Sequence, residues 1–200
     1  MRPLEEVIGY RFNDPEYLKE ALSHKSFASE SKSRVYNERL EFLGDSVVAL
    51  VVAHQLYVAF PDDAEGSLSK KKALLVSRPT LAQWAAELNL GAYLKMSKGE
   101  AMGGGRENPS ILENSLEAVI GAIFKDGGLP HAEAFVKRYI FPQALEILAK
   151  KELKDAKSLY QEKVQSEGPF SPAYKVVQEE GPDHNKTFEV AVIVNGVETG

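Results

Sequence analysis

The chain has 200 residues and a formal net charge of −5, and 44% of its residues are hydrophobic while 26% are charged. This composition is typical of a globular protein of one or two domains, large enough to bury a hydrophobic core. The chain has no cysteine, which excludes disulfides, thiolate metal sites and cysteine nucleophiles. It also shows no long apolar run and no signal-peptide segment, so we expect a cytoplasmic protein without membrane association.

The negative net charge argues against a nucleic-acid partner only weakly, because binding depends on where the cations cluster. Two local basic runs are present, "KKK" at Lys70–Lys72 and "KKELKDAK" at Lys150–Lys157. Either run taken alone is better explained as a solvated helix face, so these cations alone do not predict a function.

The segment from residue 4 to about 148 is predicted to consist of consecutive helices with short breaks. Asp14 followed by Pro15 is typical of a helix start, with Asp14 as the N-cap and Pro15 as the first helical residue. Pro61-Asp62-Asp63 is expected to end a long helix, and the helical spacing that follows is expected to break or restart near Pro79. Residues 90–110 are expected to form a long glycine-rich connection, and Gly127-Gly128 to end the helix that follows.

The pattern changes near residue 150, where a charged linker precedes a segment with the spacing of one helix. Residues 173–194 then alternate with a period of two, which favours strands, and Asn195-Gly196 is typical of a hairpin turn. The chain ends as a third strand would begin. We therefore expect an incomplete α+β domain after an all-α domain.

The stretch "NERLEFLGDS" places three acids on one side of a predicted helix. At about 100° per residue, Glu41 lies about 60° and Asp45 about 20° from Glu38 around the helix axis. A surface helix with its acids in water is one interpretation. Val48 and Val52 share the side of Glu41, however, so this side is not simply exposed to solvent.

A second helix, "ILENSLEAVIGAIF", repeats the arrangement with Asn114 and Glu117 near its start. Small residues follow that would let another helix approach closely: Ala118, Gly121 and Ala122. If the two helices cross, Glu41, Asp45, Asn114 and Glu117 would meet in a partly buried pocket. Clustered carboxylates need a compensating cation, and oxygen ligands without cysteine or histidine suit Mg²⁺ or Mn²⁺. This pattern indicates metal-assisted phosphoester hydrolysis.

"NERLEFLGDS" resembles the signature of the ribonuclease III family, whose members are endonucleases for double-stranded RNA. The likeness includes "ALSHKSF" upstream and "EGSLSKKKALLVS", "LGAYLKMSKGE" and "GGGRENPSILENSLEAVIGAIFKDGG" downstream. Further on, "DAKSLYQEKVQ" and "GPDHNKTFEVAVIVNG" resemble a double-stranded-RNA-binding domain. The resemblance implies a helical endonuclease domain over residues 1–148, a linker over 149–153 and a partial RNA-binding domain over 154–200.

The family resemblance also implies a Mg²⁺-dependent homodimer, with Mn²⁺ as a possible substitute. Each protomer would cut one strand of double-stranded RNA and leave staggered ends with a 5′-phosphate and a 3′-hydroxyl, in the processing of ribosomal and messenger RNA precursors. Asp45 and Glu117 match the catalytic positions of the family. Together with Glu41 and Asn114 they match its metal site.

Other positions match the family's RNA contacts. In the family, Glu38 and Glu65 correspond to positions near the RNA and near the valley that the two protomers of the dimer share. Ser158, Gln161 and Glu162 fall on the helix that the family lays against a minor groove, and His184 falls on the loop that reaches the next one. Phe42, beside the acidic face, is expected to pack across the dimer or in the core.

The sequence departs from the family pattern at position 114, which commonly carries Asp and is Asn here. An amide oxygen can bind Mg²⁺ but brings no negative charge. The change is either natural variation or a deliberate substitution, and Glu113 is turned about 100° from it around the helix. In the family, the RNA-binding domain continues through a third strand into a lysine-bearing helix, and we expect this continuation to be missing here. Residues 154–200 hold five Lys or Arg against eight Asp or Glu. We therefore expect this domain to bind duplex RNA weakly.

Two other functions remain open on the sequence alone. The chain could be a double-stranded-RNA-binding protein whose cleavage is impaired by Asn114, or a helical scaffold whose acids only decorate its surface. A cleavage assay separates the enzyme from the binding protein. The scaffold predicts no effect of metal on stability or RNA binding.

Overall fold

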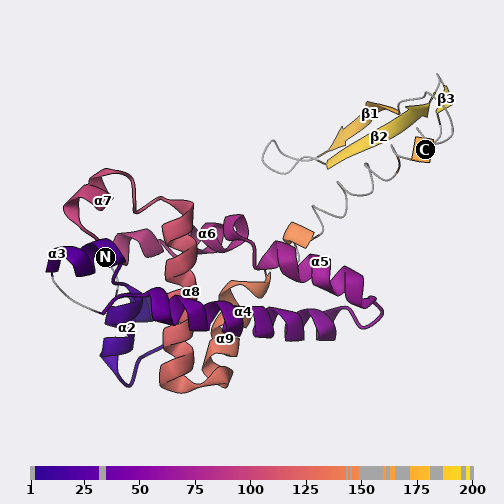
Figure 1. The fold of residues 1–200 in the computed structure, drawn as a ribbon. Coiled ribbons are helices and arrows are strands. Elements are labelled where there is room, and N and C mark those ends of the chain that lie inside the picture. Colours follow the sequence, from indigo (N-terminus) through magenta and orange to yellow (C-terminus); the bar gives the residue numbers. More distant parts are fainter. Residues whose placement is uncertain are drawn as a thin grey trace. The chain divides into compact units, whose positions relative to one another are not determined.

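The structure is a computed structural model that describes residues 3–31, 35–142, 144, 146–148, 160, 163, 164, 172–180, 187–194, 197 and 198. The chain divides into two compact units, Met1–Ile147 and Leu148–Gly200. The first unit is helical and the second contains a small sheet (Figure 1). An all-α domain followed by an α+β domain is therefore confirmed. Each unit is considered by itself below.

The first unit contains a series of helices joined by short segments (Figure 1). In chain order they are α1 (Leu4–Ile8), α2 (Pro15–Ala21), α3 (Lys25–Ser31), α4 (Glu38–Ala59), α5 (Glu65–Leu75), α6 (Arg78–Glu87), the 3₁₀ helix η1 (Leu90–Tyr93), α7 (Lys98–Met102), α8 (Pro109–Gly127) and α9 (Leu129–Tyr139). The helix α8 is central, because α2, α4, α6 and α9 all pack against it. Its residues from Ser115 to Ile123 are all buried.

The helices α4 and α8 cross in close contact at two glycines. A Cβ atom on Gly44 would lie 1.8 Å from the backbone oxygen of Glu117, and one on Gly121 would lie 2.2 Å from that of Leu40. No side chain fits at either position, since real Cβ contacts do not approach so closely. Glycine at both points therefore lets the two backbones touch, and Val48 and Ile120, both 0% exposed, complete the core around the crossing.

The helix boundaries follow local signals in the sequence. The Asp14 side chain accepts a hydrogen bond from the Glu16 amide at 2.9 Å, and Pro15 is the first residue of α2, as predicted. The helix α4 ends at Ala59, two residues before Pro61. The helix α8 ends at Gly127, and Gly128 has a φ of 78°, a value that favours glycine.

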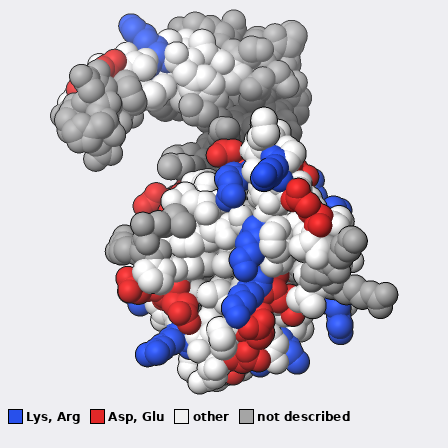
Figure 2. Space-filling model, turned by 90° about the vertical axis from the view of Figure 1, so that its left-hand side faces the viewer, with Lys and Arg blue, Asp and Glu red and all other residues white. Residues whose placement is uncertain are grey.

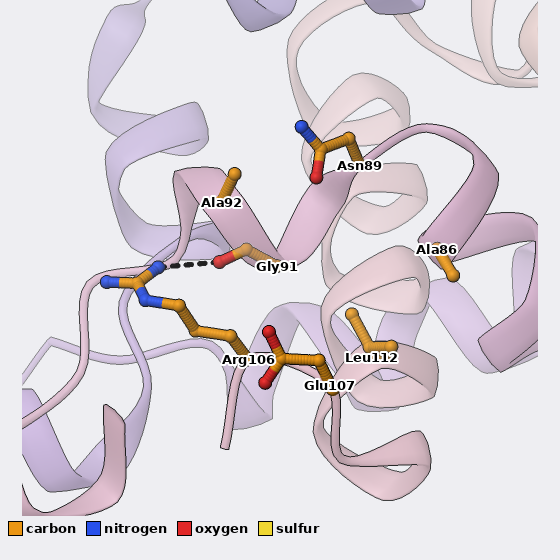
Figure 3. Close-up of a pocket in the computed structure, with 7 residues that line it drawn as sticks. All are labelled: Ala86, Asn89, Gly91, Ala92, Arg106, Glu107 and Leu112. Carbon is orange, nitrogen blue, oxygen red and sulfur yellow. Dashed lines mark hydrogen bonds between the residues drawn. The ribbon is translucent and has the colours of Figure 1, made fainter. Parts of the chain in front are cut away.

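The predicted glycine-rich connection over residues 90–110 contains two short helices, η1 and α7, which were not predicted from the sequence. One Arg106 guanidinium nitrogen donates hydrogen bonds to the backbone oxygens of Gly91 at 2.6 Å and Leu94 at 3.1 Å. Figure 3 shows the Arg106 side chain reaching across a cleft of about 290 Å³ to Gly91. These hydrogen bonds join the two ends of the segment, a contact that its glycine-rich composition does not reveal.

Among the described helices, α4 is long and apolar enough to cross a membrane by length and composition alone. The core helices of globular proteins meet the same two criteria. Val48 and Val52 of α4 are completely buried, and α8 packs along this helix. Length and composition therefore do not indicate a membrane span here.

The described strands of the second unit form an antiparallel sheet of β1 (Ala173–Glu180), β2 (Thr187–Val194) and β3 (Val197–Glu198), in that order. Ala173 lies opposite Ile193, and the pairing register shifts between Val176 and Gln178. The predicted change to extended structure is confirmed in these strands. The predicted turn at Asn195-Gly196 lies outside the described residues.

Candidate active site

The crossing of α4 and α8 brings the acidic start of one helix to the start of the other. The Asn114 side chain lies within hydrogen-bonding reach of the Glu41 carboxylate. Both residues line a cleft of about 280 Å³. The other residues that line it are His24, Lys25, Asn37, Glu38, Glu100, Asn108, Ser110 and Ile111. Glu41 of α4 and Asn114 of α8 therefore meet in one cleft, as predicted, whereas Asp45 and Glu117 are not among the residues that line it.

Glu117 is the most deeply buried acid of the predicted set, with 7% of its surface exposed. Its carboxyl has no hydrogen bond or ion pair with any residue that the structure describes. Burial raises its pKa from 4.5 to about 8, and nearby negative charges add to the effect. These charges belong to Asp45, Glu113 and Glu41. A buried, unpaired carboxyl of this kind is costly unless a cation joins it.

The charged form of the Glu41 carboxyl is also disfavoured by burial and by neighbouring negative charges. Burial raises the pKa of its carboxyl, as do the charges of Glu38 and Glu113, while Lys25 and the Asn114 amide lower it. Its buried Oε2 atom has no hydrogen-bond partner among the described residues. The site therefore contains one buried carboxylate oxygen that the described residues leave unsatisfied.

Asp45 and Glu38 are more exposed. Asp45 lies outside the lining of the cleft, and its charge acts on Glu117 from the neighbouring turn of α4. Glu38 lines the cleft and forms an ion pair with Lys25 at 3.5 Å. Glu65, at the start of α5, is also exposed and accepts a hydrogen bond from the Ser69 hydroxyl at 2.7 Å. It is not part of the cleft.

The donor set fits a hard divalent cation. In the described part of the chain, no three acidic or histidine side chains converge closely enough to hold an ion without other ligands. Mg²⁺ does not require this, because it keeps several waters and commonly uses one or two carboxylates together with substrate phosphates. The unsatisfied Oε2 atom of Glu41 and the buried Glu117 carboxyl, with Asp45 and the Asn114 amide nearby, supply that chemistry.

Sequence reasoning missed several residues of this site. Asn108 lines the cleft and caps α8, because its side chain accepts a hydrogen bond from the Ser110 amide at 2.9 Å. The Asn108-Pro109 pair is a helix-start pattern that could have identified it. His24 and Glu100 come from distant segments, and no local signal places them here. Ser158, Gln161, Glu162 and His184, the predicted RNA contacts of the second unit, lie outside the described residues.

Comparison with known proteins agrees with this geometry. Residues 14–144 match the Ribonuclease-III-like family. The chain belongs to the ribonuclease III family. It is accordingly an endoribonuclease, and residues 156–200 match the double-stranded RNA binding motif.

Known ribonuclease III proteins are similar along most of the chain. Ribonuclease 3 of Anaplasma phagocytophilum is 47% identical over 191 residues, which cover 96% of this chain and 80% of that protein. Ribonuclease 3 of Bdellovibrio bacteriovorus is 42% identical over 195 residues, covering 96% of this chain and 83% of that protein. The nuclease domain of Campylobacter jejuni ribonuclease III has 47% identity and a TM-score of 0.66, covering 70% of this chain and 96% of that one.

Proposed function

We propose that this endoribonuclease hydrolyses phosphodiester bonds of double-stranded RNA in a Mg²⁺-dependent reaction, with Mn²⁺ as a substitute. The products would carry a 5′-phosphate and a 3′-hydroxyl at staggered ends. The observation that carries the proposal is the buried Glu117 carboxyl, which has no partner among the residues that the structure describes and is close enough to Glu41 and Asp45 for their charges to act on it. This arrangement is unfavourable in a purely structural role but suits a protein that takes up a cation.

Each residue of the site would have a distinct role. Glu117, Asp45 and Glu41 would bind the cation through carboxylate oxygens, and Asn114 through its amide oxygen. A bound Mg²⁺ supplies an acidified water and stabilises the charge on the leaving oxygen. Glu117 must lose its proton for this purpose, because its pKa of about 8 keeps it largely protonated at neutral pH when no cation is bound.

The RNA would be held mainly through its phosphates and shape. Figure 2 shows Lys and Arg side chains in a band across one face of the first unit, with Asp and Glu side chains gathered beside it. Such a band supports phosphate binding even in a chain with a net charge of −5. The double-stranded RNA binding motif of residues 156–200 favours a duplex over a single strand.

We further propose that the enzyme works as a homodimer through the outer side of α4. Phe42 is 79% exposed, and Leu50 and Tyr57 on the same helix are 56% and 71% exposed. Exposed apolar groups of this size are typical of interaction surfaces. In the similar nuclease domain of Campylobacter jejuni ribonuclease III, a structurally flexible region is involved in dimer formation.

A hollow of about 720 Å³ lies beside Phe42. It is lined by Tyr17, Glu20, Glu38, Arg39, Leu40, Phe42, Leu43 and Lys125. In a two-fold dimer, Phe42 of each protomer would enter the hollow of the other, because a symmetric interface pairs each patch with its own copy. Two sites related in this way would cut opposite strands. In the cell we expect a cytoplasmic enzyme that processes ribosomal and messenger RNA precursors.

The test is cleavage of a long RNA duplex by the purified protein with Mg²⁺, compared with the same reaction in EDTA. We expect short products with staggered ends and 5′-phosphates in Mg²⁺ only, and none from a single-stranded RNA of the same length. Intact duplex in Mg²⁺, together with measurable binding, would instead favour the double-stranded-RNA-binding protein with impaired cleavage. The Glu117→Gln variant serves as the inactive control.

A further inference from the structure

An ion pair joins α6 to α8 at the edge of the site. The Arg78 guanidinium Nε and the Glu113 carboxylate Oε2 are 2.5 Å apart. The Arg78 side chain is 63% exposed, whereas that of Glu113 is only 14% exposed. Glu113 directly precedes Asn114 in the chain. The mostly buried Glu113 carboxylate thus belongs to the neighbour in sequence of Asn114, the one uncharged residue of the predicted ligand set.

The charge of Glu113 acts on two carboxyls of the site, those of Glu41 and Glu117. It raises the pKa of Glu41 and, more than Glu41 itself does, that of Glu117. Arg78 opposes this effect at Glu117, where its influence on the pKa is smaller than that of Glu113. The ion pair therefore acts as a dipole with its negative end toward the site and its positive end toward solvent.

Independent observations indicate that this point of the protein suits a cation. Glu117 is more than nine-tenths buried, with no hydrogen bond or ion pair to the described residues. The buried Glu41 Oε2 atom also has no partner among them. The Glu113 carboxylate, in contrast, is already paired with Arg78. Glu113 is also turned about 100° from Asn114 around the helix axis.

We propose that Glu113 is a positioning residue that supplies the negative charge which Asn114 lacks, and that Arg78 fixes its carboxylate at the edge of the site. Glu113 would act through the water shell of a hydrated divalent cation, as an acceptor for a metal-bound water, rather than as a ligand. Such outer partners orient the ligands and increase cation affinity. This inference rests on the proposed metal-dependent function.

The test measures cation binding without RNA and without catalysis. Mn²⁺ is titrated into the purified protein and free Mn²⁺ is followed by electron paramagnetic resonance, for the unaltered chain, Glu113→Gln, Asn114→Asp and the double variant. We expect Glu113→Gln to weaken Mn²⁺ binding roughly tenfold, as for other outer partners of a metal site. The double variant should bind at least as tightly as the unaltered chain, because the charge returns at position 114.

Thermal unfolding of each variant in EDTA provides the second readout. Glu87→Gln is the matched control, since it also removes one negative charge. Glu87 is exposed and lies at the end of α6, whereas Arg78 lies at its start. A merely structural ion pair would lower the unfolding temperature of Glu113→Gln and leave its Mn²⁺ affinity unchanged, which would overturn the inference while the proposed function stands. If the unaltered chain binds no Mn²⁺ at millimolar concentration, both proposals fail together.

Discussion

At the scale of single residues, the site combines poor stability with useful chemistry. Glu117 is buried without a partner among the described residues and Glu41 retains an unsatisfied oxygen, so both carboxyls destabilise the folded protein in the absence of a cation. Proteins keep such groups where function needs them. Asn114 is uncharged where the family commonly has Asp, so the site has one negative charge fewer and its carboxylates repel one another less. The expected consequence is a weaker attraction for the cation.

The pKa of Glu117 predicts how stability depends on pH. Its folded-state value is about 8 against an ordinary 4.5, so the folded protein keeps a proton that the unfolded chain releases between these values. Without a cation, the free energy of unfolding therefore falls as the pH rises through this window. Glu117→Gln should remove this contribution to the fall in the free energy of unfolding. Near pH 9 the variant should therefore unfold about 3 °C or more above the unaltered chain, and it should lose cleavage.

The measurement is thermal unfolding in EDTA near pH 6 and near pH 9. Glu87→Gln is again the control, because its exposed carboxyl should leave the decline as it is in the unaltered chain. An equally steep decline in Glu117→Gln would show that Glu117 does not titrate in this range.

Asn114→Asp should lower the Mg²⁺ concentration that gives half-maximal cleavage by roughly tenfold or more. A divalent ion and one added negative charge about 4 Å apart attract by about 2 kcal/mol even in a dielectric like that of water. Cleavage rates measured across a Mg²⁺ titration for both proteins would check this. An unchanged Mg²⁺ requirement and rate would contradict the idea that the missing charge matters.

At the scale of elements, the site depends on how closely two helices approach. Gly44 and Gly121 let the backbones of α4 and α8 touch, and this contact brings Glu117 near Asp45 and Glu41. The glycines therefore have a functional consequence although neither has a side chain. They set the distance between the acids of one helix and those of the other.

Gly44→Ala should destabilise the first unit by about 1–3 kcal/mol or more, as overpacking of a tight core does. The new Cβ would lie 1.8 Å from the backbone oxygen of Glu117, so α4 and α8 must separate. We expect cleavage to fall as well. The matched control is Gly66→Ala in α5, where nothing lies within 4 Å of the added Cβ. That change should stabilise the helix by about 0.5–1 kcal/mol, as measured by urea unfolding. Equal effects of the two variants would refute the role of the close crossing.

At the scale of the whole molecule, one helix serves two surfaces. The inner side of α4 is buried against α8, while its outer side exposes Phe42, Leu50 and Tyr57. The expectation that Phe42 packs in the core is excluded by its exposure of 79%. Packing across a dimer remains the proposal for this side chain.

Phe42→Ala should weaken dimerisation by about 2 kcal/mol or more, the range of interface hot spots, and leave the fold intact. Sedimentation equilibrium of both proteins would measure the dissociation constants. Met102→Ala is the control, because Met102 is 89% exposed on α7, outside the proposed surface. Identical dissociation constants for the unaltered chain and Phe42→Ala would rule out this interface.

Local features of the sequence determined much of the helical framework. Asp14-Pro15 started α2, Gly127-Gly128 ended α8, and the alternation after residue 187 formed a strand, as predicted. The spacing of Glu41 and Asp45, and the repeat at Asn114, already indicated two acidic helix starts. These signals are readable because capping, backbone preference and periodicity each act within a few residues of the chain.

Only the tertiary structure decided which groups meet and how deeply each is buried. It buried Glu117 far more than Asp45, paired Arg78 with Glu113 and ordered the segment around Arg106. Helical spacing gives the side of a helix on which a residue lies, but not what covers that side. Burial and charge pairing arise from contacts between distant segments, and these depend on how the whole chain packs.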